Sequence, residues 1–216
     1  MYDISAYYTA HSVEEAIRLR QLHPQAMLIA GGTDVLVQLR DGALQAQSLI
    51  SIAGIDALRG VRMDEDGTLC IGALSSFSLL EHDPLILAHC GVLAQAVGLV
   101  GGPQIRNVGT IGGNLCNGVT SADSVSTLHA WDAVLQLQGP DGVRRIAARD
   151  FCTGHKKTDI RPGEILTEIR ISRESWQDTK GYYIKYAMRE ALDLATLACS
   201  LNVRLSPDRR HFDRVR

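Results

Sequence analysis

The sequence predicts a mixed α+β fold, and three observations support this class. Ser12-Val13-Glu14-Glu15 has the spacing of a helix-capping box and precedes apolar residues at roughly helical intervals. Predicted strands lie on both sides of that helix, and the one after it is a short apolar run that is typical of a buried strand. Gly139-Pro140-Asp141-Gly142 separates two strand-like runs, as the turn of a β-hairpin does. The 216 residues suffice to bury a sizeable core around such elements.

The first 55 residues form a predicted strand–helix–strand unit. Its helix follows the capping box and is expected to end at His23-Pro24. The strand at residues 26–30 is wholly apolar, which is expected of a strand covered on both faces. Gly31-Gly32 follows directly, so the sequence places this glycine pair at the C-terminal edge of a strand.

Strands predominate in the rest of the chain. Asp64-Glu65-Asp66-Gly67 is a predicted turn, and Pro84 opens a single helical stretch that is expected to end at Gly98 or Gly101. The expected strands of the whole chain are residues 5–9, 26–30, 49–52, 60–63, 68–72, 133–138, 143–147, 164–171, 182–186 and 196–205.

The composition is that of an ordinary globular protein and excludes several functions. Net charge is −2 and no block of Lys or Arg is present, so a basic surface for nucleic acid or membrane is not expected. No apolar run approaches the ~18 residues of a membrane span, and the N-terminus has no secretory pattern. The five cysteines are widely spaced without a C-x-x-C pair, so we expect no disulfide framework, no zinc site and a cytoplasmic location.

Two glycine-rich stretches are the main functional signal. Gly31-Gly32-Thr33 follows an apolar run, and Gly109-Thr110-Ile111-Gly112-Gly113-Asn114 comes later. Glycine lets a ligand approach the backbone, and successive N–H groups form a nest that suits an anion such as phosphate. Each stretch alone is equally compatible with an ordinary turn, but together they predict a pyrophosphate held from both sides. Neither matches the P-loop or the Rossmann fingerprint.

Other chemical signals in the sequence are weak. Residues 118–126 contain hydroxyl groups but no G-x-S-x-G elbow, and the histidines are too scattered to predict a triad or a metal site. Asp123 precedes a helical run, so it is either a helix N-cap or a carboxylate that accepts hydroxyl hydrogen bonds from a ligand. Lys185 lies on a predicted strand, where a lysine usually faces solvent.

Two segments, "LIAGGTDVLVQLR" and "GGPQIRNVGTIGGNLCNGVTSADS", resemble the FAD-binding stretches of the flavoprotein subunits of molybdenum hydroxylases. This family includes the xanthine dehydrogenase, carbon monoxide dehydrogenase and hydroxybenzoyl-CoA reductase relatives. The second segment and "KYAMREALDLATL" are most similar to the separate FAD subunit of bacterial xanthine dehydrogenases. The resemblance implies a two-subdomain FAD-binding domain of the vanillyl-alcohol-oxidase and MurB-like (PCMH) type.

The resemblance also implies domain boundaries. We expect an N-terminal α/β FAD-binding subdomain at residues 1–55, a second α+β FAD-binding subdomain at residues 56–178, and the beginning of a C-terminal domain at residues 179–216. Residues 206–216 are typical of a turn that leads into a further strand. Either this terminus frays or the chain ends inside a domain. The family's architecture favours the second reading, a truncated C-terminal domain.

A set of cofactor-binding residues follows from the same resemblance. Residues 28–35 would wrap the FAD pyrophosphate and ribityl chain, and residues 110–114 would supply further phosphate donors. Asp34 is expected to orient the backbone rather than to touch substrate. The animal xanthine enzymes carry a tyrosine near the flavin where this chain has His155 or Lys156. No catalytic side chain and no metal ligand is expected. The implied cofactor-binding residues are Leu28, Ile29, Ala30, Gly31, Gly32, Thr33, Asp34, Val35, Val100, Gly101, Thr110, Ile111, Gly112, Gly113, Asn114, Asp123, Leu166 and Lys185.

Electron transfer is the function that the resemblance implies. Purine hydroxylation would take place at molybdenum on one partner subunit, and iron–sulfur centres on another would pass electrons to noncovalently held FAD here, which would reduce NAD⁺. The five dispersed cysteines do not provide the extra iron–sulfur insertion of the hydroxybenzoyl-CoA reductase branch. Two alternatives stay open. The chain could be the flavin subunit of a related hydroxylase that acts on carbon monoxide or an aromatic substrate, or a truncated and catalytically inactive flavoprotein.

Overall fold

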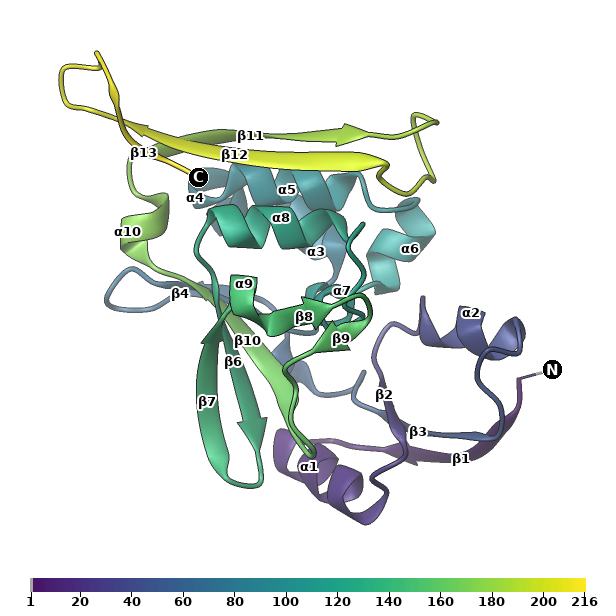
Figure 1. Cartoon of the computed structure of the whole chain (residues 1–216). Coiled ribbons are helices and arrows are strands. Elements are labelled where there is room, and N and C mark those ends of the chain that lie inside the picture. Colours follow the sequence, from purple (N-terminus) through teal and green to yellow (C-terminus); the bar gives the residue numbers. More distant parts are fainter. Residues whose placement is uncertain (1) are drawn as a thin grey trace.

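A computed structural model describes residues 2–216, and within them thirteen strands form four sheets (Figure 1). The strands are β1 (Ile4–Thr9), β2 (Met27–Ile29), β3 (Gln47–Ser51), β4 (Val61–Met63), β5 (Leu69–Gly72), β6 (Val134–Gly139), β7 (Gly142–Ala147), β8 (Cys152–Gly154), β9 (Lys157–Thr158), β10 (Ile165–Ile171), β11 (Thr179–Tyr186), β12 (Leu197–Leu205) and β13 (Phe212–Val215). The sheets have the orders β1-β3-β2, β4-β5-β10-β6-β7, β11-β12-β13 and β8-β9.

Short helices connect these strands, and the α+β class is confirmed. The helices are α1 (Val13–Leu22), α2 (Val35–Arg40), α3 (Phe77–His82), α4 (Pro84–His89), α5 (Gly91–Gly98), α6 (Pro103–Val108), α7 (Ile111–Cys116), α8 (Asp123–Ala130), α9 (Ala148–Phe151) and α10 (Arg173–Trp176), with a 3₁₀ turn at Asp56–Leu58. Among the residues described, no helix has the length and apolarity required to cross a bilayer.

The N-terminal unit forms as its capping pattern predicts. Ser12 Oγ accepts a hydrogen bond from the Glu15 backbone N–H at 3.1 Å, while the Glu15 carboxylate accepts one from the His11 N–H at 2.9 Å. All pairs in this sheet are parallel, and β3 is its central strand. The apolar strand β2 is therefore an edge strand, and Ala30 connects its C-terminal end to Gly31.

One helix expected from the sequence is in fact two. The stretch from Pro84 divides into α4 and α5 at Cys90, whose φ and ψ of −134° and 41° are not helical. Asp83 Oδ1 caps α4 by accepting from the Leu85 N–H at 2.9 Å, and Gly91, a poor helix former, starts the next helix. The sequence did not predict the short helices α2, α3, α6, α7, α9 and α10.

A layer of helices lies between the five-stranded sheet and the C-terminal sheet (Figure 1). The main core joins residues of β5, β6 and β10 to residues of α3, α5, α7 and α8, and Trp131 and Phe151 are its largest buried side chains. On the other side of this layer, β11 packs on α5 and β12 packs on α8. The helices thus hold the five-stranded sheet and the C-terminal sheet together.

The C-terminal sheet has two unlike faces. Strand β12 pairs antiparallel with β11 and with β13, so it is central. Tyr183 points inward and is 4% exposed, whereas its neighbours Tyr182 and Ile184 point outward and are largely exposed. Residues 206–216 form a turn followed by β13, as the sequence predicts.

Candidate functional site

The two glycine stretches lie against each other although they are far apart in the sequence. Gly31 packs on the backbone at the end of α6, where a Cβ atom on Gly31 would lie 1.9 Å from the Val108 carbonyl oxygen. Asn117, after α7, donates from Nδ2 to Asp34 Oδ1 at 2.9 Å. The loop after β2 therefore contacts the segment around α7 at both of its ends, and only glycine fits at the first contact.

The loop at residues 31–35 carries a row of unused hydrogen-bond donors. Within residues 2–216, none of its five backbone N–H groups has a protein acceptor, and all five residues are at least partly exposed. Gly32 has a φ of +73°, which favours glycine and turns the chain into α2. Consecutive unpaired N–H groups at such a turn suit the oxygens of a phosphate or pyrophosphate.

In the second stretch, residues 109–114, most backbone N–H groups already donate to acceptors of the protein. Gly112 donates to the Ala73 carbonyl at 2.8 Å, and Gly113 donates to Oγ1 of Thr110, the N-cap of α7, at 3.1 Å. A Cβ on Gly112 would lie 2.6 Å from the Ala73 oxygen, whereas one on the exposed Gly113 would meet only Thr110 Oγ1, at 2.9 Å. Gly112 is therefore required by packing, and Gly113 presents an open surface.

Asp123 and Lys185 form a buried ion pair. Asp123 is the first residue of α8, not its N-cap, and its side chain makes no capping bond, so the N-cap interpretation is wrong. Its Oδ2 accepts from Lys185 Nζ at 3.0 Å, and its Oδ1 accepts from the Tyr183 hydroxyl at 2.7 Å. Both partners are 8% exposed at the side chain, so Lys185 does not face solvent.

Val100 and Gly101 lie in the turn that connects α5 to α6. Gly101 has a φ of +52°. The turn is held from two sides, since Lys185 Nζ donates to the Leu99 carbonyl at 3.0 Å and Arg106 Nη1 donates to the Val100 carbonyl at 3.4 Å. Through α6, this turn leads to Val108 and thus to the contact with Gly31.

Seven of the predicted site residues pack into the hydrophobic cores or against them, among them Val35 in the N-terminal unit and Val100 at the main core. Leu28, Ile29 and Ala30 pack in the N-terminal unit. Ile111 and Leu166 lie in the main core with exposures of 0% and 5%, and Leu166 pairs with Leu137 in the sheet. No polar contact joins Leu166 to the glycine stretches, and its role at a cofactor stays a prediction.

Several residues of this site were missed from the sequence. Ser124 donates to Asn114 Oδ1 at 2.6 Å, which ties α8 to the second glycine stretch. Asn117-Gly118 ends α7 with a φ of +64° at the glycine, a helix-terminating pattern that could have been noticed. Tyr183 precedes Lys185 by two residues on a strand, and this spacing could have placed both on one face.

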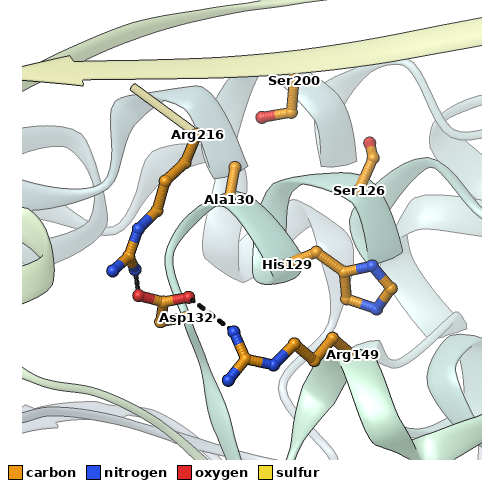
Figure 2. A pocket seen from close by; sticks show the side chains of 7 residues that line it. All are labelled: Ser126, His129, Ala130, Asp132, Arg149, Ser200 and Arg216. Atoms are coloured by element: carbon orange, nitrogen blue, oxygen red, sulfur yellow. Dashed lines mark ion pairs between the residues drawn. The ribbon is translucent and has the colours of Figure 1, made fainter. Parts of the chain in front are cut away.

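Two cavities adjoin α8. The larger, about 530 Å³, is lined by residues 118–122, the β8–β9 hairpin with His155, and residues 195–198. This hairpin is attached to the end of α7, because the backbone N–H of Lys156 donates to the Gly118 carbonyl oxygen at 2.8 Å. The smaller cavity, about 420 Å³, is polar, and in it Arg149 and Arg216 both pair with Asp132 (Figure 2). It includes none of the predicted site residues.

The titratable groups near the site have clear physical causes for their pKa shifts. Burial, together with the Asp123 carboxylate, raises the pKa of Tyr183, so its hydroxyl remains a donor. Burial raises the pKa of the Cys116 thiol to about 12, which makes it unreactive at neutral pH. Among residues 2–216, no cluster of three or more His, Cys, Asp or Glu side chains suits a metal ion.

Comparison with known proteins gives a consistent picture. Residues 2–173 match the model of the family described as the FAD binding domain in molybdopterin dehydrogenase. The chain is 38% identical over 216 residues, which is 100% of this chain and 73% of the relative, to the xanthine dehydrogenase FAD-binding subunit of Escherichia coli O157:H7. It is 34% identical over 201 residues, 93% of this chain and 69% of the relative, to the carbon monoxide dehydrogenase medium chain of Hydrogenophaga pseudoflava.

A solved structure shares the whole fold. It is a carbon monoxide dehydrogenase from Hydrogenophaga pseudoflava that lacks the Mo-pyranopterin moiety of the molybdenum cofactor. The TM-score is 0.93 at 32% identity, and the match covers 100% of this chain and 74% of that one. The match includes the C-terminal sheet as well as the two glycine stretches.

Proposed function

Because the chain belongs to the family of FAD-binding domains in molybdopterin dehydrogenases, we propose that it is the FAD-binding subunit of a xanthine dehydrogenase-type molybdenum hydroxylase. Its relatives are oxidoreductase subunits, and its fold is the PCMH-type FAD-binding fold of this family. The proposal concerns the residues that hold the cofactor, the acceptor and the substrate of the complex.

The unpaired donors of residues 31–35 carry the proposal. FAD brings a pyrophosphate, and a row of free backbone N–H groups on a loop that contacts Val108 and Asn117, on either side of Gly113 in the sequence, fits this anion. The backbone approaches closely here because Gly31 and Gly32 carry no side chain. The bound flavin supplies electron and hydride transfer, while the protein supplies binding, orientation and exclusion of water. The Asn114 amide and the turn at Val100-Gly101 are further proposed contacts.

The proposed electron path runs through two partner subunits to the flavin of this chain and then to an acceptor. We assign the oxidation of a purine to a molybdenum-binding partner, the delivery of electrons to an iron–sulfur partner, and NAD⁺ as the final acceptor. The similarity to a xanthine dehydrogenase subunit supports this choice, together with the family description, which names molybdopterin. The five free cysteines fit a reducing compartment such as the cytoplasm.

A related hydroxylase remains a second candidate. The structural match to a carbon monoxide dehydrogenase extends over the entire chain, at an identity close to that of the xanthine relative. A flavin subunit does not touch the substrate that is oxidised at the partner, so its own site is compatible with both. Purification of the whole complex and assay with xanthine and with carbon monoxide would separate the two candidates.

A titration with FAD tests the central proposal. The purified chain is expected to bind one FAD per chain, with a shifted flavin absorbance band and a quenched flavin fluorescence. FMN, which lacks the pyrophosphate and the adenosine, should bind much more weakly. A folded chain that leaves FAD free at high micromolar concentration would favour the alternative of an inactive flavoprotein.

A further inference from the structure

We infer that Tyr183 is a positioning residue of the flavin site, which acts by holding the Asp123 carboxylate. The inference rests on the proposed function and deepens it, because Tyr183 is not among the cofactor-binding residues that the resemblance implies. Tyr183 does not belong to either glycine stretch, and its ring is enclosed in the main core. Its influence on the flavin must therefore pass through Asp123.

The Tyr183 side chain is fixed in one orientation. The residue is 4% exposed, and its hydroxyl donates to Asp123 Oδ1 at 2.7 Å. Its backbone N–H donates to Gln95 Oε1 at 3.3 Å, so β11 is also attached to α5 at this residue. A short hydrogen bond from a rigid donor to a charged acceptor is strong, and its geometry determines where the carboxylate can lie.

Asp123 in turn connects Tyr183 to the turn beside the proposed flavin site. Its second oxygen pairs with Lys185 Nζ, which also donates to the Leu99 carbonyl at 3.0 Å. Leu99 is the C-cap of α5 and immediately precedes Val100-Gly101. A buried ion pair is sensitive to the loss of one partner, because the remaining charge is left unbalanced. If the carboxylate moves, Lys185 and the Leu99 turn are expected to move with it.

The first residues of α8 reach a second wall of the same site. Ser124, next to Asp123, donates to Asn114 Oδ1 at 2.6 Å, and Asn114 belongs to the second glycine stretch. The start of α8 is thus attached to the Leu99 turn on one side and to Asn114 on the other. Tyr183, on β11, holds this start through Asp123, so one hydroxyl distant from the glycine loop is expected to influence two segments that line the site.

The test removes only this hydroxyl. In Tyr183→Phe we expect the Kd for FAD to rise roughly tenfold, the scale for one hydrogen bond to a charged group. The visible circular dichroism of the bound flavin should also change, which general loss of stability would not produce in a folded, FAD-saturated sample. Tyr182→Phe is the matched control, because Tyr182 is 61% exposed on the opposite face of the same strand. It should leave both readouts unchanged.

A double-mutant cycle shows whether Tyr183 acts through Asp123. We expect Asp123→Ala to weaken FAD binding, and Tyr183→Phe to have no further effect in that background. If Tyr183→Phe does not fold, Asp123→Asn replaces it. Asn keeps the shape and one acceptor oxygen but removes the charge that Lys185 pairs with, so FAD affinity and the flavin spectrum should again change.

The outcomes separate this inference from the proposed function. If the wild-type chain does not bind FAD, both are overturned. If it binds FAD and Tyr183→Phe matches the wild type in Kd and spectrum, the positioning role alone is wrong. Effects of Tyr183→Phe and Asp123→Ala that simply add would also contradict it, because Tyr183 would then act independently of the carboxylate.

Discussion

Asn117 donates a hydrogen bond from Nδ2 to Oδ1 of Asp34 at 2.9 Å, across 83 residues of sequence. Asp34 belongs to the loop with the unpaired donors, and Asn117 is the C-cap of α7. The bond therefore joins the two glycine-rich segments at the point where the proposed pyrophosphate site is built. It ties the Asp34 side chain to the end of α7, and the expected role of Asp34 in orienting the backbone stays a prediction.

Loss of this bond should weaken FAD binding. Asp34→Ala removes the acceptor, and we expect the Kd for FAD to rise about 3- to 10-fold, as for a partly exposed hydrogen bond of about 1 kcal/mol. Asp34→Asn is the control, because its amide oxygen can still accept from Asn117. Isothermal titration of the three proteins measures the effect. Equal affinities for wild type and Asp34→Ala would mean that the bond does not order the loop.

The glycines of the second stretch should divide into a binding residue and a packing residue. Gly113→Val places methyl groups on the open surface of α7, so we expect a folded protein that no longer binds FAD. Gly112→Ala brings a Cβ within 2.6 Å of the Ala73 carbonyl oxygen, so we expect a lower free energy of unfolding. Thermal unfolding and FAD titration of both variants distinguish the two effects.

A matched substitution makes this comparison quantitative. Gly113→Ala adds a single methyl group, whose only near contact is Thr110 Oγ1 at 2.9 Å. It should bind FAD with an affinity between those of wild type and Gly113→Val, while unfolding close to the wild-type temperature. Full FAD binding by a folded Gly113→Val protein would remove Gly113 from the proposed site.

Local signals in the sequence predicted most of the elements. Ser12 and Glu15 fix the start of α1 through contacts within four residues, and Gly142 with a φ of +108° closes the β6–β7 hairpin. Such signals are reliable because the deciding contacts lie within one element. They failed at Cys90, where the apolar pattern continues but the backbone leaves the helical region. An apolar pattern reports burial, and it does not report a break between two buried helices.

The site could be predicted only in part, because its geometry depends on long-range contacts. Glycine pairs indicated where the backbone is accessible, but not that Gly112 serves to pack α7 against Ala73. The residue type of Lys185 favoured solvent, whereas a carboxylate 62 residues away balances its charge in the interior. A single sequence contains no information about which distant charge will meet it, so only the resemblance to a family indicated that Lys185 belongs to the site.

We predict that FAD is held noncovalently. Residues 28–35 and 110–114 contain no histidine or cysteine that could form a bond to the flavin. Burial also raises the pKa of the neighbouring Cys116 thiol to about 12, which keeps it protonated. Precipitation of the flavin-loaded protein with acid should therefore leave the yellow colour in the supernatant. A yellow pellet after washing would show a covalent link.

His129 should make the stability of the protein fall in mild acid. It lies beside both cavities, and burial lowers its pKa in the folded state. The unfolded chain therefore binds the proton more readily, so the contribution of His129 is present above about pH 6.5 and declines as pH falls below it. His129→Gln should reduce the drop in melting temperature between pH 7.5 and pH 5.5. His11→Gln, at an exposed position, is the control and should not change it.

The outward face of the C-terminal sheet should promote self-association of the chain. Ile184 and Leu201 lie on adjacent strands of this face, with exposures of 58% and 46%, and Phe212 on β13 is 62% exposed. A contiguous apolar surface of this kind is unusual on a protein that remains monomeric. The double substitution Ile184→Thr and Leu201→Thr places β-branched side chains at both outward positions, so the strands should persist.

Sedimentation velocity at increasing protein concentration measures the result. We expect the double variant to remain monomeric at concentrations where the wild-type chain associates, with an unchanged melting temperature because neither side chain packs in the core. Val143→Thr is the control, since Val143 is 58% exposed on the separate β6–β7 hairpin and should not alter association. Identical sedimentation of the wild type and the double variant would show that this face does not drive contacts between chains.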